Sequence, residues 1–190
     1  MKPPATDRLI LRNWENRDRE LFHRINSDET VMEFFEMRRT RQQSDELLDH
    51  IASGIAQRGY GFWALERRDT GECIGFTGLQ PTNAVPSRET GCVEIGWRLV
   101  PECWGYGYIT EAANACLAFG FDELGLEEIV SFAVANNRRS TAVMTRIGMV
   151  AEPSGDFDHP QVARQDLKRH LLYTLTAEQW RGRKQAPALP

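Results

Sequence analysis

The sequence has no long apolar run and no large excess of charge of either sign. No stretch is long and apolar enough to cross a bilayer, and residues 1–6 contain no apolar segment that could serve as a signal peptide. The net charge of -4 gives no electrostatic reason to expect a nucleic-acid partner. These absences favour a cytoplasmic protein that binds neither membranes nor nucleic acids.

Cysteine is also scarce, and its spacing is uninformative for metal binding. The chain has four cysteines, and no two of them form a C-x-x-C pair: Cys73, Cys92, Cys103 and Cys116. Zinc sites in proteins usually need such pairs, so we expect no metal. A disulfide framework is typical of much shorter secreted chains, so we expect reduced thiols.

What the sequence does contain is the composition of an ordinary globular protein. It has 190 residues, of which 41% are hydrophobic and 26% are charged. This length fits one domain with a sizeable core. A basic cluster near the end lies in a segment that contains proline, which is typical of a frayed terminus. We therefore predict one domain over residues 1–180 and a flexible tail over residues 181–190.

The apolar pattern predicts helices and strands in a mixed order. Helical spacing indicates a first helix around Leu21, Phe22 and Ile25. Three more helices are predicted at residues 41–57, 108–124 and 139–147. Strands are predicted at residues 8–12, 62–65, 73–79, 93–99, 129–135 and 171–175. This order predicts an α/β protein in which helices pack on a mixed sheet.

A glycine loop between a strand and a helix is the most informative segment. Gly105 and Gly107 would let the backbone turn sharply after the strand at residues 93–100. The helix that follows would present unpaired N–H groups, which suit a phosphate. The two glycines could instead form only a turn. A P-loop is excluded because no Lys-Ser or Lys-Thr follows, and a dinucleotide fingerprint is disfavoured because Thr110 replaces its third glycine.

Several ordered segments together resemble a known family. They cover residues 6–12, 71–75, 94–97, 101–112, 137–140 and 146–149. In these segments the chain resembles the GNAT acetyltransferases, and specifically their RimJ/RimL branch, which acetylates N-terminal amines of ribosomal proteins and related substrates. The resemblance reaches to about Trp180. One departure is Glu102, which stands where the family's cofactor loop begins with glutamine or arginine, and it puts in doubt any side-chain contact from that position.

The resemblance implies a fold and a cofactor. The fold would be the GNAT fold, α/β (α+β), with a mixed and mostly antiparallel central sheet of about seven strands and helices on both faces. The co-substrate would be acetyl-CoA, with its pyrophosphate on the glycine loop. The residues that the resemblance implies for cofactor binding are Ile95, Trp97, Trp104, Gly105, Tyr106, Gly107, Tyr108, Ile109 and Asn137.

The implied reaction is direct attack of an amine on the thioester, which needs a base and an acid but no covalent intermediate. Glu94 is the best candidate for the general base, because it interrupts the alternating strand that should lie beside the thioester. It could instead point to solvent or pair with Arg98. Ser140 matches the residue that would protonate the thiolate in this branch. Asn137 and Ser140 could also cap a helix.

The acceptor is the least determined part of the interpretation. The branch favours the α-amine of a peptide or protein N-terminus, while the superfamily also acetylates antibiotics, polyamines and amino acids. Residues 32–39 join the first two predicted helices and would line either the acceptor site or the core. Residues 33–41 hold two glutamates and three arginines, so this candidate wall is mixed and slightly basic, which argues against a polycationic acceptor. A non-catalytic CoA-binding module on the same fold is the alternative to an enzyme, and a monomer or a homodimer is expected.

Overall fold

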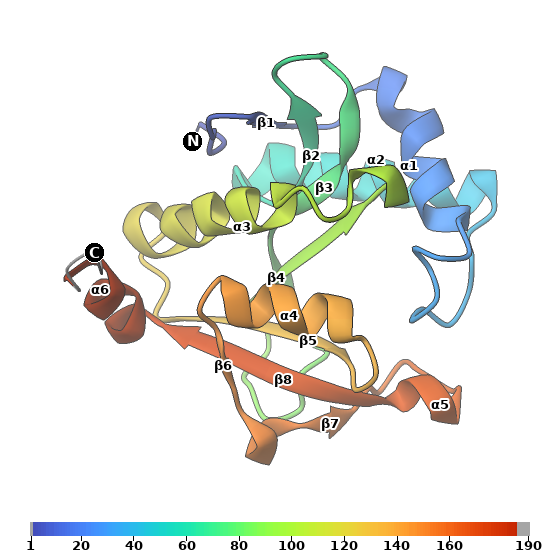
Figure 1. Cartoon of the computed structure of the whole chain (residues 1–190). Coiled ribbons are helices and arrows are strands. Elements are labelled where there is room, and N and C mark those ends of the chain that lie inside the picture. Colours follow the sequence, from blue (N-terminus) through green and yellow to red (C-terminus); the bar gives the residue numbers. More distant parts are fainter. Residues whose placement is uncertain (1, 186–190) are drawn as a thin grey trace.

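A single twisted sheet organises the chain in the computed structural model, which describes residues 2–185, with side chains up to residue 183. The strand order is β1-β2-β3-β4-β5-β8-β6, and β7 pairs with β8 beside β6. The strands are β1 (Leu9–Arg12), β2 (Phe62–Arg67), β3 (Cys73–Thr82), β4 (Cys92–Leu99), β5 (Glu128–Val134), β6 (Val150–Ala151), β7 (Phe157–Asp158) and β8 (Arg169–Thr176). Among the strands of the described residues, only the pairing of β4 with β5 is parallel (Figure 1). The expected mixed and mostly antiparallel sheet is confirmed.

Helices cover both faces of this sheet. They are α1 (Arg19–Ser27), α2 (Arg41–Arg58), α3 (Tyr108–Ala118), α4 (Arg138–Arg146), α5 (Gln165–Lys168) and α6 (Ala177–Gln185). Figure 1 shows α3 and α4 in front of the sheet and α2 behind it. Alternate side chains of β2 reach the two layers, as the pleat of a strand requires. Trp63 packs on Phe119, with ring centroids 5.4 Å apart, whereas Phe62 packs on Phe76, which contacts Phe22 of α1.

Local sequence signals explain where α2 begins and ends. Its N-cap is Thr40, whose side chain accepts from the Gln43 amide, and the Gln43 side chain accepts from the Thr40 amide in return. This reciprocal pair satisfies two N–H groups that a helix start leaves free. Gly59 ends the helix with φ at 83°, a conformation that favours glycine. The helix predicted at residues 41–57 is therefore confirmed.

The junction of β4 and β5 is the irregular part of the sheet. Their ladder has one registered pair, Glu94 opposite Val130, whereas β3 and β4 are in register from Gly75 to Thr82. A hydrogen bond from the Ser131 hydroxyl to the Ile95 carbonyl, 2.9 Å long, ties the two strands together beside this pair. Most of β4 therefore has no ladder partner on the side that faces β5.

The last described helix reaches into the segment that the sequence predicts to be a tail. Helix α6 continues to Gln185, so the first part of the expected tail is helical, and residues 186–190 lie outside the described residues. The Arg183 guanidinium donates to the Ile147 carbonyl at 2.5 Å. Within residues 2–185, no helix combines the length and apolar character needed to span a membrane. In the same range, no three His, Cys, Asp or Glu side chains converge as metal ligands.

Candidate active site

The glycine loop and the first turn of α3 form a row of free backbone N–H groups. Gly105 and Gly107 have φ at 83° and 78°, in the left-handed region that favours glycine, and Gly107 is the N-cap of α3. In the described part of the chain, no amide from residue 105 to residue 110 donates a hydrogen bond. A helix N-terminus also carries partial positive charge. The row is therefore suited to bind an anion such as a pyrophosphate.

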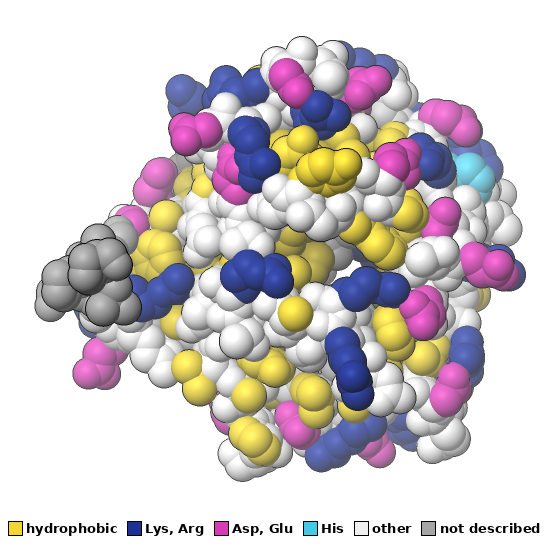
Figure 2. All heavy atoms as spheres, viewed as in Figure 1, with side chains coloured by type: hydrophobic (Ala, Val, Ile, Leu, Met, Phe, Trp, Pro, Cys, Tyr) yellow, Lys and Arg dark blue, Asp and Glu magenta, His cyan; other side chains and the backbone are white. Residues whose placement is uncertain are grey.

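A cleft of about 810 Å³ opens in front of these amides. Its volume lies in the range of small-molecule binding sites. Figure 2 shows a hollow on this face between α3 and α4, with basic side chains around it. Of the nine residues expected to bind the cofactor, seven line the cleft: Trp97, Trp104, Gly105, Gly107, Tyr108, Ile109 and Asn137. Ile95 and Tyr106 are not part of its lining.

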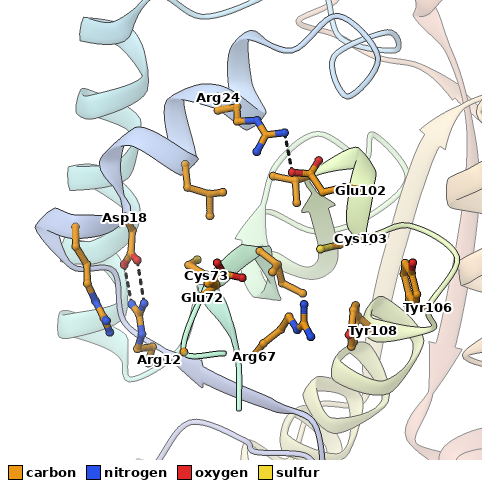
Figure 3. Close-up of a pocket in the computed structure, with 15 residues that line it drawn as sticks. Arg12, Asp18, Arg24, Arg67, Glu72, Cys73, Glu102, Cys103, Tyr106 and Tyr108 are labelled. Carbon is orange, nitrogen blue, oxygen red and sulfur yellow. Dashed lines mark hydrogen bonds and ion pairs between the residues drawn. The ribbon is translucent and has the colours of Figure 1, made fainter. Parts of the chain in front are cut away.

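The other side of the glycine loop faces a second cavity of about 590 Å³ (Figure 3). The Tyr106 side chain lines this cavity and stacks on Tyr108, with ring centroids 5.9 Å apart. Glu102 lies here too, and its carboxylate pairs with the Arg24 guanidinium at 2.7 Å. The Glu102 side chain is therefore held by α1, and its departure from the family pattern leaves the amide row unchanged.

Glu94 lies on β4 in a largely desolvated position. Burial raises the pKa of Glu94 to about 7, although the hydrogen bond from Gln80 and the charge of Arg98 act in the opposite direction. The Gln80 amide nitrogen donates to Glu94 Oε1 at 2.8 Å. Among the described residues, no cation lies within ion-pair distance of Glu94. Of the two expected alternatives, pairing with Arg98 is not seen among the described residues, while the Glu94 residue as a whole keeps partial exposure to solvent.

Arg98 was assigned no role of its own from the sequence, yet it lines the cleft. Its Nη1 donates to Asn26 Oδ1 at 2.5 Å, and its guanidinium lies 3.9 Å from the centroid of the Phe35 ring. Burial lowers the pKa of Arg98 to about 9, so the guanidinium stays protonated at neutral pH. Since its contacts come from α1 and the segment after α1, no local pattern in the sequence could indicate them.

The start of α4 distinguishes helix capping from a catalytic role for Asn137 and Ser140. Asn137 is the N-cap, and its Oδ1 accepts from the Ser140 amide at 3.1 Å. The Ser140 hydroxyl makes no hydrogen bond to any described residue, and Ser140 lines the cleft. Capping therefore accounts for Asn137 but not for the Ser140 side chain. Glu94 does not line this cleft, so the structure does not bring Glu94 and Ser140 to one cavity wall.

Two further arginines of the cleft lie in motif segments but received no role from the sequence. Arg139 pairs with Glu33 at 2.7 Å, and its guanidinium lies 4.8 Å from the centroid of the Trp104 ring. Arg146 Nη1 donates to Thr110 Oγ1 at 3.4 Å, beside the start of α3. Both contacts depend on how α4 packs against the start of α3 and the segment at residues 31–35, so no local sequence pattern could indicate them.

The segment between α1 and α2 contributes to both the cleft and the core. Val31, Phe34 and Phe35 line the cleft, whereas Met32 is buried. Further along, Glu36 Oε1 accepts from the Ala163 amide at 2.6 Å, which joins this segment to the loop before β8. Phe34 and Phe35 therefore line the cleft, whereas Met32 belongs to the core.

Comparison with known proteins relates most of the chain to acetyltransferases. The family model of the acetyltransferase (GNAT) domain matches residues 8–150. YkkB, an uncharacterized protein of Bacillus subtilis, is 33% identical over 146 residues, which is 76% of this chain and 83% of that protein. The FsC-acetyl coenzyme A-N(2)-transacetylase of Aspergillus fumigatus is 28% identical over 192 residues, which is 97% of this chain and 80% of that protein. A GNAT-family acetyltransferase structure from Bacillus anthracis, 24% identical, superposes with a TM-score of 0.76 over 92% of this chain and 98% of that one.

Proposed function

Because the chain belongs to the GNAT acetyltransferase family, whose members use acetyl-CoA as co-substrate, we propose that it acetylates the α-amine at the N-terminus of a peptide or protein. The observation that carries the proposal is the row of unpaired amides that faces a cleft large enough for a cofactor and an acceptor. The RimJ/RimL-like segments at residues 6–12 and 137–140 support the choice of a terminal amine.

The cofactor positions in this proposal follow from the backbone. The amides at the start of α3 bind the pyrophosphate, and Gly105 and Gly107 keep that row open because they have no side chain in the way. Trp97 lies on the part of β4 that has no ladder partner on β5, so we assign its backbone to the pantetheine arm. Ile95 lies next to it, but its carbonyl already accepts from the Ser131 hydroxyl. The Asn137 side-chain amide is a further polar contact at the cleft wall.

When bound, acetyl-CoA supplies an activated acetyl thioester, and the amine attacks it directly. The chain must then accept a proton from the amine, and Glu94 is our candidate because its pKa of about 7 suits a base that works near neutral pH. A cysteine nucleophile is not required. Cys103, the cysteine that lines the cleft, supports this view because burial raises the pKa of its thiol and disfavours the reactive thiolate.

The leaving thiolate needs a proton, and Ser140 is our candidate donor. Ser140 lines the cleft, and its hydroxyl has no hydrogen-bond partner among the described residues, so it is a candidate to contact a bound thioester. The Asn137 cap holds the first turn of α4, and with it the position of Ser140.

A second acceptor class has its own support. The Aspergillus relative, whose alignment spans nearly the whole chain, is named for transfer to an N(2) position. That relation favours a small-molecule amine as the alternative to a peptide terminus.

The test is an acetylation screen that measures thiol release from acetyl-CoA. Short peptides with varied first residues are compared with a panel of amino acids, polyamines and aminoglycosides. We expect at least one peptide to be acetylated with a higher kcat/KM than any small amine. A preference for a small amine over every peptide would overturn the N-terminal assignment.

A further inference from the structure

Arg98 is a partly buried cation whose hydrogen-bonding capacity is mostly unused. A guanidinium has five N–H donors, but only its bond to Asn26 is made among the described residues. No carboxylate of those residues lies within 4.0 Å of it. A charge in a poorly solvated position is unfavourable unless it is paired, so this guanidinium would gain from an anionic partner.

The surroundings of Arg98 hold it in one orientation. Asn26 is fully buried and its own Nδ2 donates to the Phe22 carbonyl at 2.7 Å, which fixes Oδ1 toward Arg98. On another side the guanidinium lies over Phe35. Arg98 is also one of the residues that line the cleft, and a planar guanidinium held in this way is well matched to a carboxylate.

The charges of the cleft agree with this view. Its lining includes three arginines, Arg98, Arg139 and Arg146, and one carboxylate, Glu111. Glu111 already accepts from the Thr6 hydroxyl and the Arg8 guanidinium. A polyamine would therefore find no free carboxylate on the described lining and would meet unpaired positive charge. An anionic acceptor would be attracted to the same surface.

We infer that Arg98 selects acceptors that carry a carboxylate close to the reactive amine. Glu94 and Arg98 lie four residues apart on one face of β4, which separates their α-carbons by roughly 13 Å. The long side chains shorten this span to the scale of one or two peptide residues. For a peptide acceptor, the carboxylate would thus belong to the first or second residue. The inference rests on the proposed acetyl transfer and narrows its substrate class.

The experiment compares acceptors in pairs that differ only in charge. The pairs are tetrapeptides with aspartate or asparagine at the first or second position, together with glycine and glycinamide. Wild type, Arg98→Gln, Arg98→Lys and Arg139→Gln are assayed with each pair. Arg139→Gln is the matched control because it removes a cleft arginine that already has a partner, Glu33. Calorimetry with the same acceptors on the CoA-bound enzyme gives a readout that does not depend on turnover.

For wild type, we expect kcat/KM to be roughly ten- to hundredfold higher for the acidic member of a pair, the range for a hydrogen bond between charged groups. In Arg98→Gln the ratio should fall to about one, with KM for acetyl-CoA unchanged. It should survive in part in Arg98→Lys, and in Arg139→Gln it should equal the wild-type ratio even if the overall rate changes. The ratio of acceptor affinities within each pair, measured by calorimetry, should change among the variants in the same way as the ratio of kcat/KM.

Three results would overturn the inference: no charge preference in wild type, an equal loss for both members of each pair in Arg98→Gln, or a raised KM for acetyl-CoA in that variant. If no peptide is acetylated and glycine is preferred over glycinamide, the peptide assignment fails and the inference stands. If peptides are acetylated regardless of charge, the peptide assignment stands and the inference fails.

Discussion

Replacing Glu94 with glutamine should stabilise the protein, and the gain should grow as the pH rises from about 5 to 8. Glutamine has the shape of glutamic acid and can keep the bond from the Gln80 amide, which donates to Oε1 in the structure. What it removes is the ionisation of a group whose charged form is poorly solvated in the folded state. Substituting a catalytic residue often stabilises a protein, because active sites hold charged groups in environments that disfavour the charge.

The magnitude follows from the two pKa values of Glu94. Folding raises the pKa from 4.5 to about 7. Below pH 4.5 both states are protonated, and the neutral carboxyl contributes its full stability. As the pH rises through 7, this contribution is lost, because the unfolded chain ionises first and the folded chain must follow at a cost. At 1.36 kcal/mol per pKa unit, the loss levels off at about 3 kcal/mol above pH 8. For a chain of this size that corresponds to roughly 6–12 °C in Tm.

The assay is urea unfolding of wild type and Glu94→Gln at several pH values between 5 and 8. A matched control is Glu111→Gln. Glu111 is partly buried, but hydrogen bonds from Thr6 and Arg8 lower its pKa, so its charged form is the favoured one. Its contribution is present above its unfolded pKa and lost in acid, so this variant should be destabilised at neutral pH. A difference between wild type and Glu94→Gln that stays constant from pH 5 to 8 would refute the raised pKa.

Three other predictions concern the loop and α4. At a hundredfold excess over its Kd, acetyl-CoA should stabilise wild type by about 2.7 kcal/mol and raise its Tm. Gly107→Val should abolish this rise in Tm, because φ at 78° excludes a β-branched residue. In the control Gly71→Val, whose glycine has a similar φ but lies outside the cleft, the rise should persist. Ser140→Ala should lower turnover about 100- to 10,000-fold without changing Tm. Asn137→Ala should instead lower the stability of the fold by about 1 kcal/mol. A lowered Tm with unchanged turnover in Ser140→Ala would contradict the acid role. Glu102→Gln should change stability by under about 1 kcal/mol and leave acetyl-CoA affinity unchanged; calorimetry showing weaker binding would contradict this.

The elements with strong local patterns could be predicted from the sequence. The alternation at residues 93–99 became β4, and the apolar stripe at residues 41–57 became α2 with its cap and its terminal glycine. β6 and β7 were not predicted, because two-residue strands have no period of their own. They form only because β8 offers partners, Val150 opposite Thr174 and Phe157 opposite His170.

The same distinction applies to the site. The glycine loop was predictable because its left-handed glycines and the helix start after it are local features. The raised pKa of Glu94 was not predictable, because it arises from the burial that the whole fold creates, which outweighs the opposing hydrogen bond from Gln80 on a neighbouring strand. Residue type alone therefore identified a candidate base but could not show that its pKa lies near neutrality.

Arg98 shows why position on a strand is a weak guide to pairing. In the sequence it stands on the same face of the strand as Glu94, which made an ion pair between them one of the alternatives. In the structure its guanidinium turns to Asn26, distant in sequence, and to Phe35. This leaves a carboxylate that is easily protonated and a cation without an anionic partner on one face of β4. Because Glu94 and Arg98 do not pair with each other, each is left for a group of a ligand. An acceptor that carries an amine and a nearby carboxylate has both groups, the amine for Glu94 and the carboxylate for Arg98.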